Sequence, residues 1–468
     1  MEWNYKIHKP ILLFVVCSVP RKHEHLAATQ SKIYSITQQL LWSKMLMDDR
    51  ITSNGSEEPR KPEGKNRAIA VCFILGLGSL VSWNSILTIG DYYYQLFPNY
   101  HPSRVLTLVY QPFAIGTLIV MTHYESKINT RLRNVVGFTL FFVATFLILI
   151  LDLATSGKGG IGPYLAICFL SACFGVADAF VQGGMVGDLY FMCPKFVQSF
   201  LAGLAASGAL ISLLRVLTKL AFEKSSNGLR KGAILFLAIS TLIEFLCIFL
   251  YAIYFTKLPI VKYYRAKAAS EGSKTVAADL AAAGIKTETN DQAEHDDKQV
   301  DRLSNKQLFL ANIDYAADLF LIYVITLSIF PGFLYENTGE HQLGTWYPIV
   351  LIVMYNVLDL IARYIPLVQW LKLESRKGLL IAILSRFLLI PAFYFTAKYG
   401  DQGWMIFLTS FLGLTNGYLT VCVFTLAPRG YKAPEQNALG NMLVICLLCG
   451  IFAGGTLGWL WIIGKDSF

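Results

Sequence analysis

Charged residues are scarce in this chain of 468 residues: Asp, Glu, Lys and Arg make up 15% of it, whereas hydrophobic residues make up 54%. Soluble globular proteins contain about 25% charged residues, because their surface has to be solvated. The low proportion excludes an ordinary soluble globular protein. It predicts an integral membrane protein whose partner is the lipid bilayer.

The sequence also lacks the patterns that indicate metal, redox or hydrolytic chemistry. Its 9 cysteines lie largely inside apolar runs and form no disulfide framework or zinc pattern. No histidine cluster, metal-ligand spacing, nucleophile–base pair or Gly-rich phosphate loop is visible. The net charge of +9 has no basic soluble domain to carry it. We therefore expect no enzyme, no cofactor or metal, and no nucleic acid polymer as partner.

What the chain does contain is eleven apolar runs, each long enough to cross a bilayer as a helix of ~20 residues. They predict an all-α, polytopic membrane protein. The runs lie at about residues 68–94, 104–123, 134–154, 162–188, 196–222, 232–256, 308–333, 346–367, 378–398, 403–426 and 439–463.

One long polar interruption divides these runs into six plus five. Residues 257–306 begin basic, become Ala-rich and end acidic, so we expect a solvated loop. The predicted organisation is a largely disordered segment at 1–67, a six-helix bundle at 68–256, the loop, and a five-helix bundle at 307–468. A 6+5 arrangement is typical of transporters whose two halves rock around a central site.

The Lys and Arg residues between the runs predict the orientation. Basic residues cluster after the second and eighth runs and are fewer after the first, third, seventh and ninth, although the segment after the fifth run breaks this pattern. The positive-inside rule then places the N-terminus and residues 257–306 in the cytoplasm and the C-terminus outside the cell. We expect the plasma membrane.

Two opposite charges inside the eighth run are its most unusual feature. Asp359 and Arg363 are four residues apart, so they share a helix face with Ile352 and Asn356 and can shield each other. Each charge costs roughly 2.5–3.5 kcal/mol to insert. One interpretation is a structural ion pair that locks this helix to a neighbour. The other, which the rest of the chain favours, is a polar strip that faces a water-filled cavity and binds a polar solute.

The first run carries Trp83 on a face with Leu80 and Leu87, and Asn84 lies beside this face. Trp83 is too deep in the run for the interfacial aromatic belt. A large flat ring with an N–H donor suits stacking on a heterocycle, and a core aromatic residue fits the same position equally well.

Further polar residues occur inside other runs. Asp178 and Gln182 are four apart in the fourth run, beside a stripe of small residues that contains Gly183. Gly450, Gly454 and Gly458 form a similar stripe in the last run, and both stripes predict close helix packing. Other charges that we expect to be buried, except where they snorkel from helix ends, are Asp188, Arg215, Glu244, Asp314, Asp318 and Arg386.

Several short motifs occur in an order that is specific as a set. They are Leu75 to Asn84, Gln182-Gly183, Thr326 to Gly332, Asp359 with Arg363, and Gly413 to Tyr418 followed by Pro428. From about residue 67 to the C-terminus the chain resembles the equilibrative nucleoside transporter family, and its details look like the plant-type branch.

The resemblance implies an eleven-helix fold related to the major facilitator architecture. Its implied function is alternating-access transport of nucleosides, with nucleobases as a second class, either facilitative or proton-linked. By this resemblance Trp83 would stack on the base, with Leu80, Asn84 and Leu87 around it. Gln182 would bind the edge of the base. Asp359 and Arg363 would bind the ribose hydroxyls, with Asn356 close by. The family commonly has Asp-Trp-x-Gly-Arg where this chain has Asp-Leu-Ile-Ala-Arg. The packing around the charges can therefore differ.

The residues themselves leave alternatives open. The same polar groups would suit a sugar or another polar solute, and a receptor or scaffold without transport is a further alternative. Asp178 stands where other members of the family have a small residue, so the resemblance assigns it no role. A carboxyl group in a low-dielectric cavity takes up a proton readily, so Asp178 is a candidate proton site, with Glu244 in reserve. A merely hydrogen-bonded Asp178 is the alternative.

Overall fold

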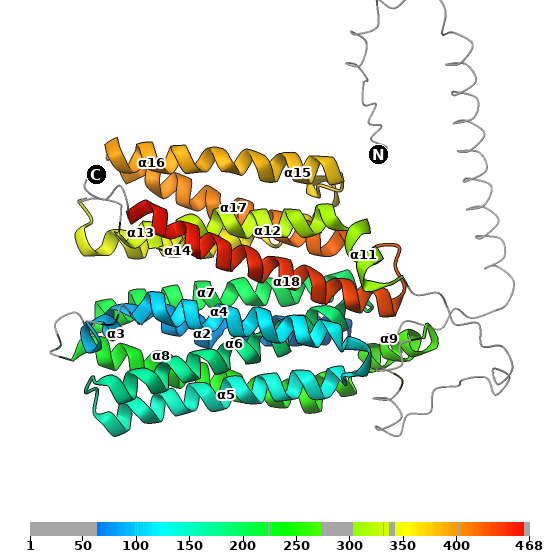
Figure 1. Cartoon of the computed structure of the whole chain (residues 1–468), viewed down its shortest axis with the longest axis horizontal. Helices are drawn as coiled ribbons and strands as arrows, with labels where there is room; N and C mark the ends of the chain where they lie inside the picture. The colour runs from blue at the N-terminus through cyan, green and yellow to red at the C-terminus, as the bar shows by residue number, and fades with distance from the viewer. Residues whose placement is uncertain are drawn as a thin grey trace, which may run out of the picture. The chain divides into compact units, whose positions relative to one another are not determined.

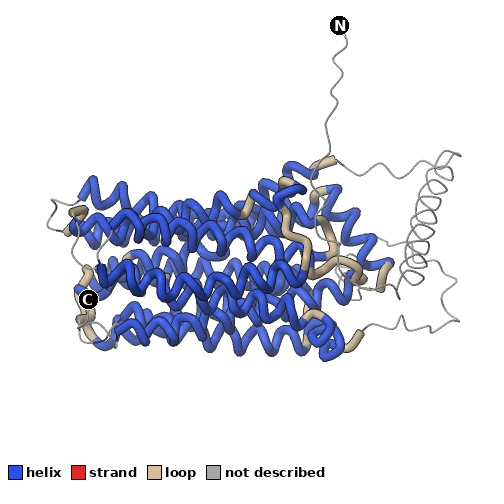
Figure 2. Tube along the Cα trace, turned by 90° about the horizontal axis from the view of Figure 1, so that it is seen from above, coloured by secondary structure: helices blue, strands red, loops and turns tan. Residues whose placement is uncertain are grey.

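The computed structural model describes residues 63–98, 100, 102–222, 225, 227–272, 277, 303–330, 332–336, 342–399 and 402–462. The predictions for nearly all of residues 1–67, and for most of the loop beyond residue 272, lie outside the described residues. The described residues form helices and no strand, which confirms the all-α class (Figure 1). The long helices lie side by side, and Figure 2 shows their connections gathered at the two ends.

Within the part of the chain that the structure describes, eleven spans are long and apolar enough to cross a membrane, as predicted. In chain order their helices are α2 (Lys65–Thr88), α4 (Pro102–His123), α5 (Thr130–Thr155), α6 (Ile161–Tyr190), α7 (Pro194–Phe222), α8 (Gly228–Phe249), α12 (Ile313–Ile329), α14 (Tyr347–Ala362), α15 (Arg376–Ser385) with α16 (Leu389–Tyr399), α17 (Gln402–Leu426) and α18 (Ala433–Leu457). The shorter helices are α3 (Gly90–Leu96), α9 (Pro259–Ser270), α11 (Asn305–Ala311) and α13 (Gly332–Glu336).

Some helix boundaries differ from the predicted runs for local reasons. The seventh run divides at Asn312, whose side-chain amide donates to the Leu308 carbonyl and so competes with the helix pattern. The ninth run contains a tighter turn at Arg386–Leu388, just before Pro391, which has no backbone N–H to donate. The last helix begins at Ala433, earlier than predicted, because Pro434 and the side chain of Glu435 suit a first helical turn.

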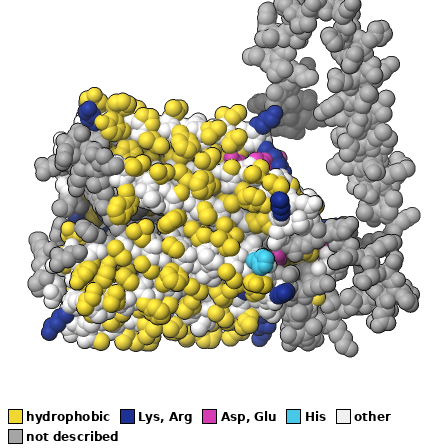
Figure 3. Space-filling model, viewed as in Figure 1, with side chains coloured by type: hydrophobic (Ala, Val, Ile, Leu, Met, Phe, Trp, Pro, Cys, Tyr) yellow, Lys and Arg dark blue, Asp and Glu magenta, His cyan; other side chains and the backbone are white. Residues whose placement is uncertain are grey.

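The outside of the described bundle is apolar along its length. Large side chains such as Phe169, Leu242 and Leu388 are each more than two-thirds exposed. Figure 3 shows hydrophobic side chains covering this face, with Lys and Arg gathered toward its two ends. An apolar surface of this extent suits lipid tails, and the basic ends suit the headgroup regions.

The helices pack mainly within two groups. In the first, α2 packs on α7, α4 and α5 pack on α6, and α5 packs on α8. In the second, α12 packs on α18 and α14 on α17. The two groups meet where α18 contacts α4 and α6, and where α14 contacts α7. A polar bond from α5 to α18 also joins the two groups: Arg133 Nη1 donates to Asn441 Oδ1, at 2.9 Å.

Glycine allows the closest of these contacts. Gly76 of α2 lies against the Phe200 backbone of α7, and Gly203 of α7 lies against Phe73. In α18, Gly450 faces the Phe320 carbonyl of α12, and Gly454 faces the next turn. Because lipid provides no hydrophobic drive between helices, backbone contact of this kind is a main source of packing energy. The glycine stripes therefore pack helices as predicted.

The loop prediction was wrong at its start, because α9 is a packed helix. Its buried residues include Ile260, Val261 and Arg265. Arg265 Nη2 forms an ion pair of 2.5 Å with Asp188 at the end of α6. Burial alone would lower the pKa of Arg265, but Asp188 and Tyr251 hold this pKa above its usual range. A basic residue that we expected in solvent therefore anchors α9 to the bundle.

We predict that Gly454→Ala lowers thermal stability and Gly455→Ala does not. A Cβ atom at position 454 would lie 2.6 Å from the Val324 carbonyl oxygen, whereas one at 455 would have no atom within 4 Å. Overpacking of this kind costs roughly 1–3 kcal/mol. Thermal unfolding of both purified variants in the same detergent measures the difference. Equal midpoints would show that the α12–α18 contact does not need a glycine.

Candidate substrate site

The predicted site residues of the first helix group surround an aromatic stack. Trp83 of α2 lies on Tyr110 of α4, with ring centroids 4.0 Å apart and planes 19° apart. Trp83 is 7% exposed and Tyr110 is 2% exposed. One face of the indole is thus covered by a residue that we did not single out, because spacing alone does not distinguish Tyr110 from other core aromatic residues.

Asp178 and Gln182 interact within α6, as their spacing suggested. Gln182 Nε2 donates to Asp178 Oδ1 at 2.5 Å, and both side chains are buried. The Tyr110 hydroxyl faces the same carboxyl group. Among the described residues, Asp178 Oδ2 has no hydrogen-bond partner. Trp83, Tyr110, Asp178 and Gln182 therefore form one connected cluster, here called the indole–amide cluster.

Two of the predicted site residues are asparagines that hydrogen-bond to the same stretch of α7, one from each helix group. Asn84 of α2 donates to Ser207 Oγ at 2.6 Å, and Asn356 of α14 donates to Ser212 Oγ at 2.7 Å. Gly208 lies between the two serines and leaves room for the Asn356 amide. Helix α7 thus connects α2 to α14. The remaining predicted residues, Leu80 and Leu87, are half-buried against the hydrophobic core.

Asp359 and Arg363 form the buried ion pair that their spacing predicted. Arg363 Nη2 lies 3.1 Å from Asp359 Oδ2, and Asn416 Nδ2 of α17 donates to Asp359 Oδ1 at 2.8 Å. Arg363 Nη1 donates to the Leu201 carbonyl of α7 at 2.6 Å, and Gln198 of α7 donates to the Arg363 carbonyl at 2.9 Å. The pair thus ties α14 to α7, which is the geometry that the structural interpretation requires.

A line of polar side chains continues from this pair across the second helix group. Asn416 Oδ1 lies 2.9 Å from the Thr326 hydroxyl of α12, and Arg386 Nη2 donates to the same hydroxyl at 2.8 Å. Asp359 is 4% exposed and Arg363 is 5% exposed. Both side chains are therefore almost closed to solvent in this structure. We call Asp359, Arg363, Asn416, Thr326 and Arg386 the ion-pair cluster.

The other charges that we expected to be buried fall into two sets. Asp188, Glu244, Asp318 and Arg386 are buried, whereas Arg215 and Asp314 are only partly buried, which agrees with the snorkelling expected near helix ends. Glu244 of α8 accepts hydrogen bonds from the hydroxyls of Ser82 and Thr145. No group of three or more His, Cys, Asp or Glu side chains that could hold a metal occurs in the described part of the chain.

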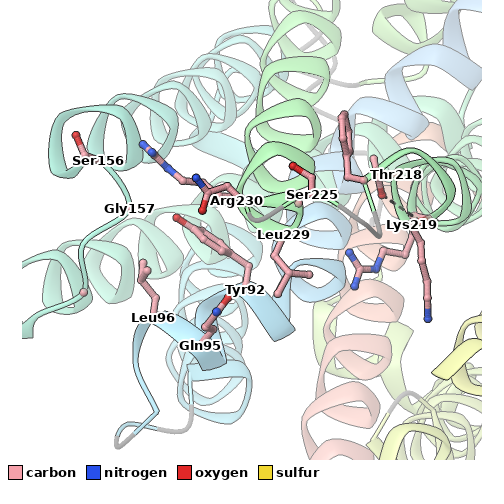
Figure 4. Close-up of a pocket in the computed structure, with 15 residues that line it drawn as sticks. Tyr92, Gln95, Leu96, Ser156, Gly157, Thr218, Lys219, Ser225, Leu229 and Arg230 are labelled. Carbon is pink, nitrogen blue, oxygen red and sulfur yellow. Dashed lines mark hydrogen bonds between the residues drawn. The ribbon is translucent and has the colours of Figure 1, made fainter. Parts of the chain in front are cut away.

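A cavity of about 820 Å³ lies at one end of the first helix group (Figure 4). It is bordered by α3, residues 156–159, the end of α7 and the start of α8. Arg230, which lines it, forms an ion pair of 3.1 Å with Asp152, and Lys219 Nζ lies 4.8 Å from the Trp346 ring centroid. None of the predicted substrate residues is among its described lining residues. The cavity is therefore separate from both clusters.

Residues 166–463 match the family model described as nucleoside transporter. The chain is 68% identical to equilibrative nucleotide transporter 3 of Arabidopsis thaliana over 412 residues, which cover 88% of this chain and 98% of the relative. This chain belongs to the nucleoside transporter family. It is also 65% identical to equilibrative nucleotide transporter 5 of the same plant, with 88% of this chain and 98% of that relative covered. The resemblance to a plant-type branch is thereby confirmed.

Solved structures that resemble this family member are transporters of the same architecture. A proton:xylose symporter of the major facilitator superfamily has a TM-score of 0.55 and 11% identity, with 86% of this chain and 89% of that chain covered. A human organic anion transporter has a TM-score of 0.51 and 13% identity, with 88% and 96% covered. At such identities the likeness concerns the fold alone, and it confirms the predicted major facilitator architecture.

Proposed function

We propose that this protein carries nucleosides across the membrane by alternating access and is not an enzyme. The observation that best supports this is that residues of the family's motifs gather in two buried polar clusters. Trp83 and Gln182 belong to the indole–amide cluster, and Asp359 and Arg363 belong to the ion-pair cluster. The two clusters belong to different helix groups, which meet through α7 and α14. Movement of one group against the other would open a path between them.

The chemistry of the two clusters matches the two parts of a nucleoside. In our proposal the base stacks on the Trp83 face that Tyr110 leaves open, and Gln182 binds the base edge. The vicinal ribose hydroxyls donate to Asp359 and accept from Arg363. Asn84, Leu80 and Leu87 border the base, and Asn356 lies near the ribose. The structural role of the ion pair and its substrate role are compatible, because substrate would replace the contacts to α7.

A nucleoside fits the site better than a nucleotide, although the relatives are named nucleotide transporters. Arg363 is already paired with Asp359, and Arg386 donates to a backbone carbonyl and a hydroxyl. A phosphate group placed beside Arg363 would be repelled by the Asp359 carboxylate, which already pairs with that arginine. The ribose pair alone would also bind a hexose, so a sugar carrier is the competing assignment.

We also propose that the membrane is the plasma membrane, with the N-terminus in the cytoplasm and the C-terminus outside. The basic segments after the second and eighth spans support this orientation. The second of these segments includes Arg376, which pairs with Asp314 at the start of α12, so both residues would lie at the cytoplasmic surface.

The first prediction from this proposal concerns the substrate. Cells that express the full chain should take up labelled adenosine or uridine in a saturable manner, and unlabelled nucleosides should compete. A labelled hexose and adenosine monophosphate should not be taken up above the level of empty cells, because neither offers both an uncharged ribose and a base. Saturable hexose uptake without nucleoside uptake would replace this proposal by the sugar carrier.

Asp359→Asn and Arg363→Ala should each remove most nucleoside uptake per molecule at the membrane. Each change deletes one ribose contact and also leaves a buried partner unpaired, which can cost ~3–5 kcal/mol and reduce abundance. Surface abundance therefore has to be measured with uptake. Asp314→Asn is the matched control, because it breaks an Asp–Arg pair that is partly exposed and contributes little. Normal uptake per molecule in both cluster variants would exclude a substrate role.

We further propose that transport is proton-linked through Asp178. Asp178 Oδ2 has no described hydrogen-bond partner, and the groups that face the carboxyl are Gln182 and the Tyr110 hydroxyl. The cation described nearby is Arg133 of α5, which donates to the neighbouring Ala179 carbonyl instead. A proton on Asp178 would remove an uncompensated charge beside the base site. Loading with substrate should therefore be easier when Asp178 is protonated.

The expected pH dependence follows from the easier loading of substrate when Asp178 is protonated. Uptake should rise as the external pH falls from about 7.5 to about 5.5, because more carboxyl groups carry a proton. Asp178→Asn should flatten the profile, and Glu244→Gln should not. Initial rates with and without a protonophore measure the dependence. A flat wild-type profile would leave facilitated diffusion, and a flat profile in Glu244→Gln alone would move the proton site to Glu244.

A further inference from the structure

The indole–amide cluster fixes which end of the Gln182 carboxamide faces Asp178. Asp178 Oδ1 can only accept a hydrogen bond, both in the carboxylate and when a proton is held on the unpartnered Oδ2, and only the amide nitrogen of Gln182 can donate one. The 2.5 Å contact between Gln182 Nε2 and Asp178 Oδ1 therefore allows one orientation of the carboxamide. Rotating it by half a turn would bring two oxygen atoms together, which is strongly unfavourable in a buried site.

Asp178 itself has little freedom to turn away from Gln182. Its side chain is fully buried, and it lies one helical turn before Gln182 on α6. The Tyr110 hydroxyl faces the carboxyl group, and the Tyr110 ring is held by its stack on Trp83. The orientation of Gln182 thus depends on contacts from α2, α4 and α6 together.

The oxygen of the same carboxamide is left as the end that can meet a solute. No described hydrogen bond uses Gln182 Oε1, although the side chain is 5% exposed. Oε1 is also absent from the fully buried polar atoms that lack a partner, so it is not wholly enclosed by the described residues. An acceptor is therefore presented where the proposed function has the base edge.

We propose that Asp178 is a positioning residue that makes Gln182 read the base through an acceptor. This inference rests on the proposed nucleoside transport and deepens it. The protein selects bases that offer an N–H donor at the edge, such as the N3–H of uridine, the N1–H of inosine and the amino group of adenosine. A methyl group in place of that hydrogen leaves Oε1 unpaired and also collides with it.

The test compares each nucleoside with its N-methyl counterpart. The probes are uridine against 3-methyluridine and inosine against 1-methylinosine, as competitors of labelled uridine or adenosine uptake by the full chain in cells. In the wild type the unmethylated nucleoside should compete about tenfold better or more, the size expected for one hydrogen bond and its unpaired partner. A wild-type ratio near one for both pairs overturns the inference.

Substitutions of Asp178 test whether it positions the Gln182 carboxamide. Their effect is measured on the discrimination ratio, which is the ratio of competition by the unmethylated and the N-methyl nucleoside. Asp178→Asn should lower the discrimination ratio several-fold, because an asparagine can both donate and accept and so permits both orientations of Gln182. Asp178→Ser is the second variant if the first folds poorly. Glu244→Gln, a buried carboxyl group bonded only to hydroxyls, should leave the ratio unchanged.

A double variant tests whether Asp178 acts through Gln182. Gln182→Leu should abolish discrimination, and adding Asp178→Asn to it should change the ratio no further, because Asp178 acts through Gln182. If Asp178→Asn lowers uptake of all nucleosides equally, or alters only the pH profile, Asp178 does not position Gln182 and the inference fails. If the wild type at normal surface abundance takes up no nucleoside, the proposed function fails instead.

Discussion

A charge inside an apolar bundle has to be compensated within the protein, because lipid tails cannot solvate it. Asp359 meets this constraint with an arginine on one oxygen and an asparagine amide on the other. Asn416 comes from α17, whereas Arg363 ends α14 itself and also donates to α7, so the donors that neutralise one carboxylate hold α14 against two other helices.

Two buried carboxyl groups of the first helix group meet the same constraint differently. Asp178 and Glu244 are fully buried, and their described partners are an amide and hydroxyls rather than cations. Such partners supply hydrogen bonds without supplying charge. A carboxyl group held in this way responds to the proton concentration and to what approaches it, whereas one held by an arginine does not.

The sequence predicted the features that depend on local spacing. Run lengths predicted the eleven spans, and four-residue spacing predicted that Asp359 meets Arg363 and that Asp178 meets Gln182. Contacts that depend on helix packing could not be predicted in this way. Tyr110 covers Trp83 from another helix, and Arg363 donates to a backbone carbonyl, a group that every residue possesses. Arg265 illustrates the opposite error, since a basic residue in a polar segment gave no sign of being buried.

The polar bonds described between the two helix groups differ from the ion pairs within each group. Arg133 donates to an asparagine, Arg363 to a backbone carbonyl, and Asn356 to a serine, so the acceptors are uncharged. Among the described pairs, no ion pair joins α2–α8 to α12–α18. Water can take the place of either partner in such bonds at a net cost of about 1 kcal/mol each. Separation of the two groups is thus limited by how readily water enters the contact, and dissolved salt has little to screen there.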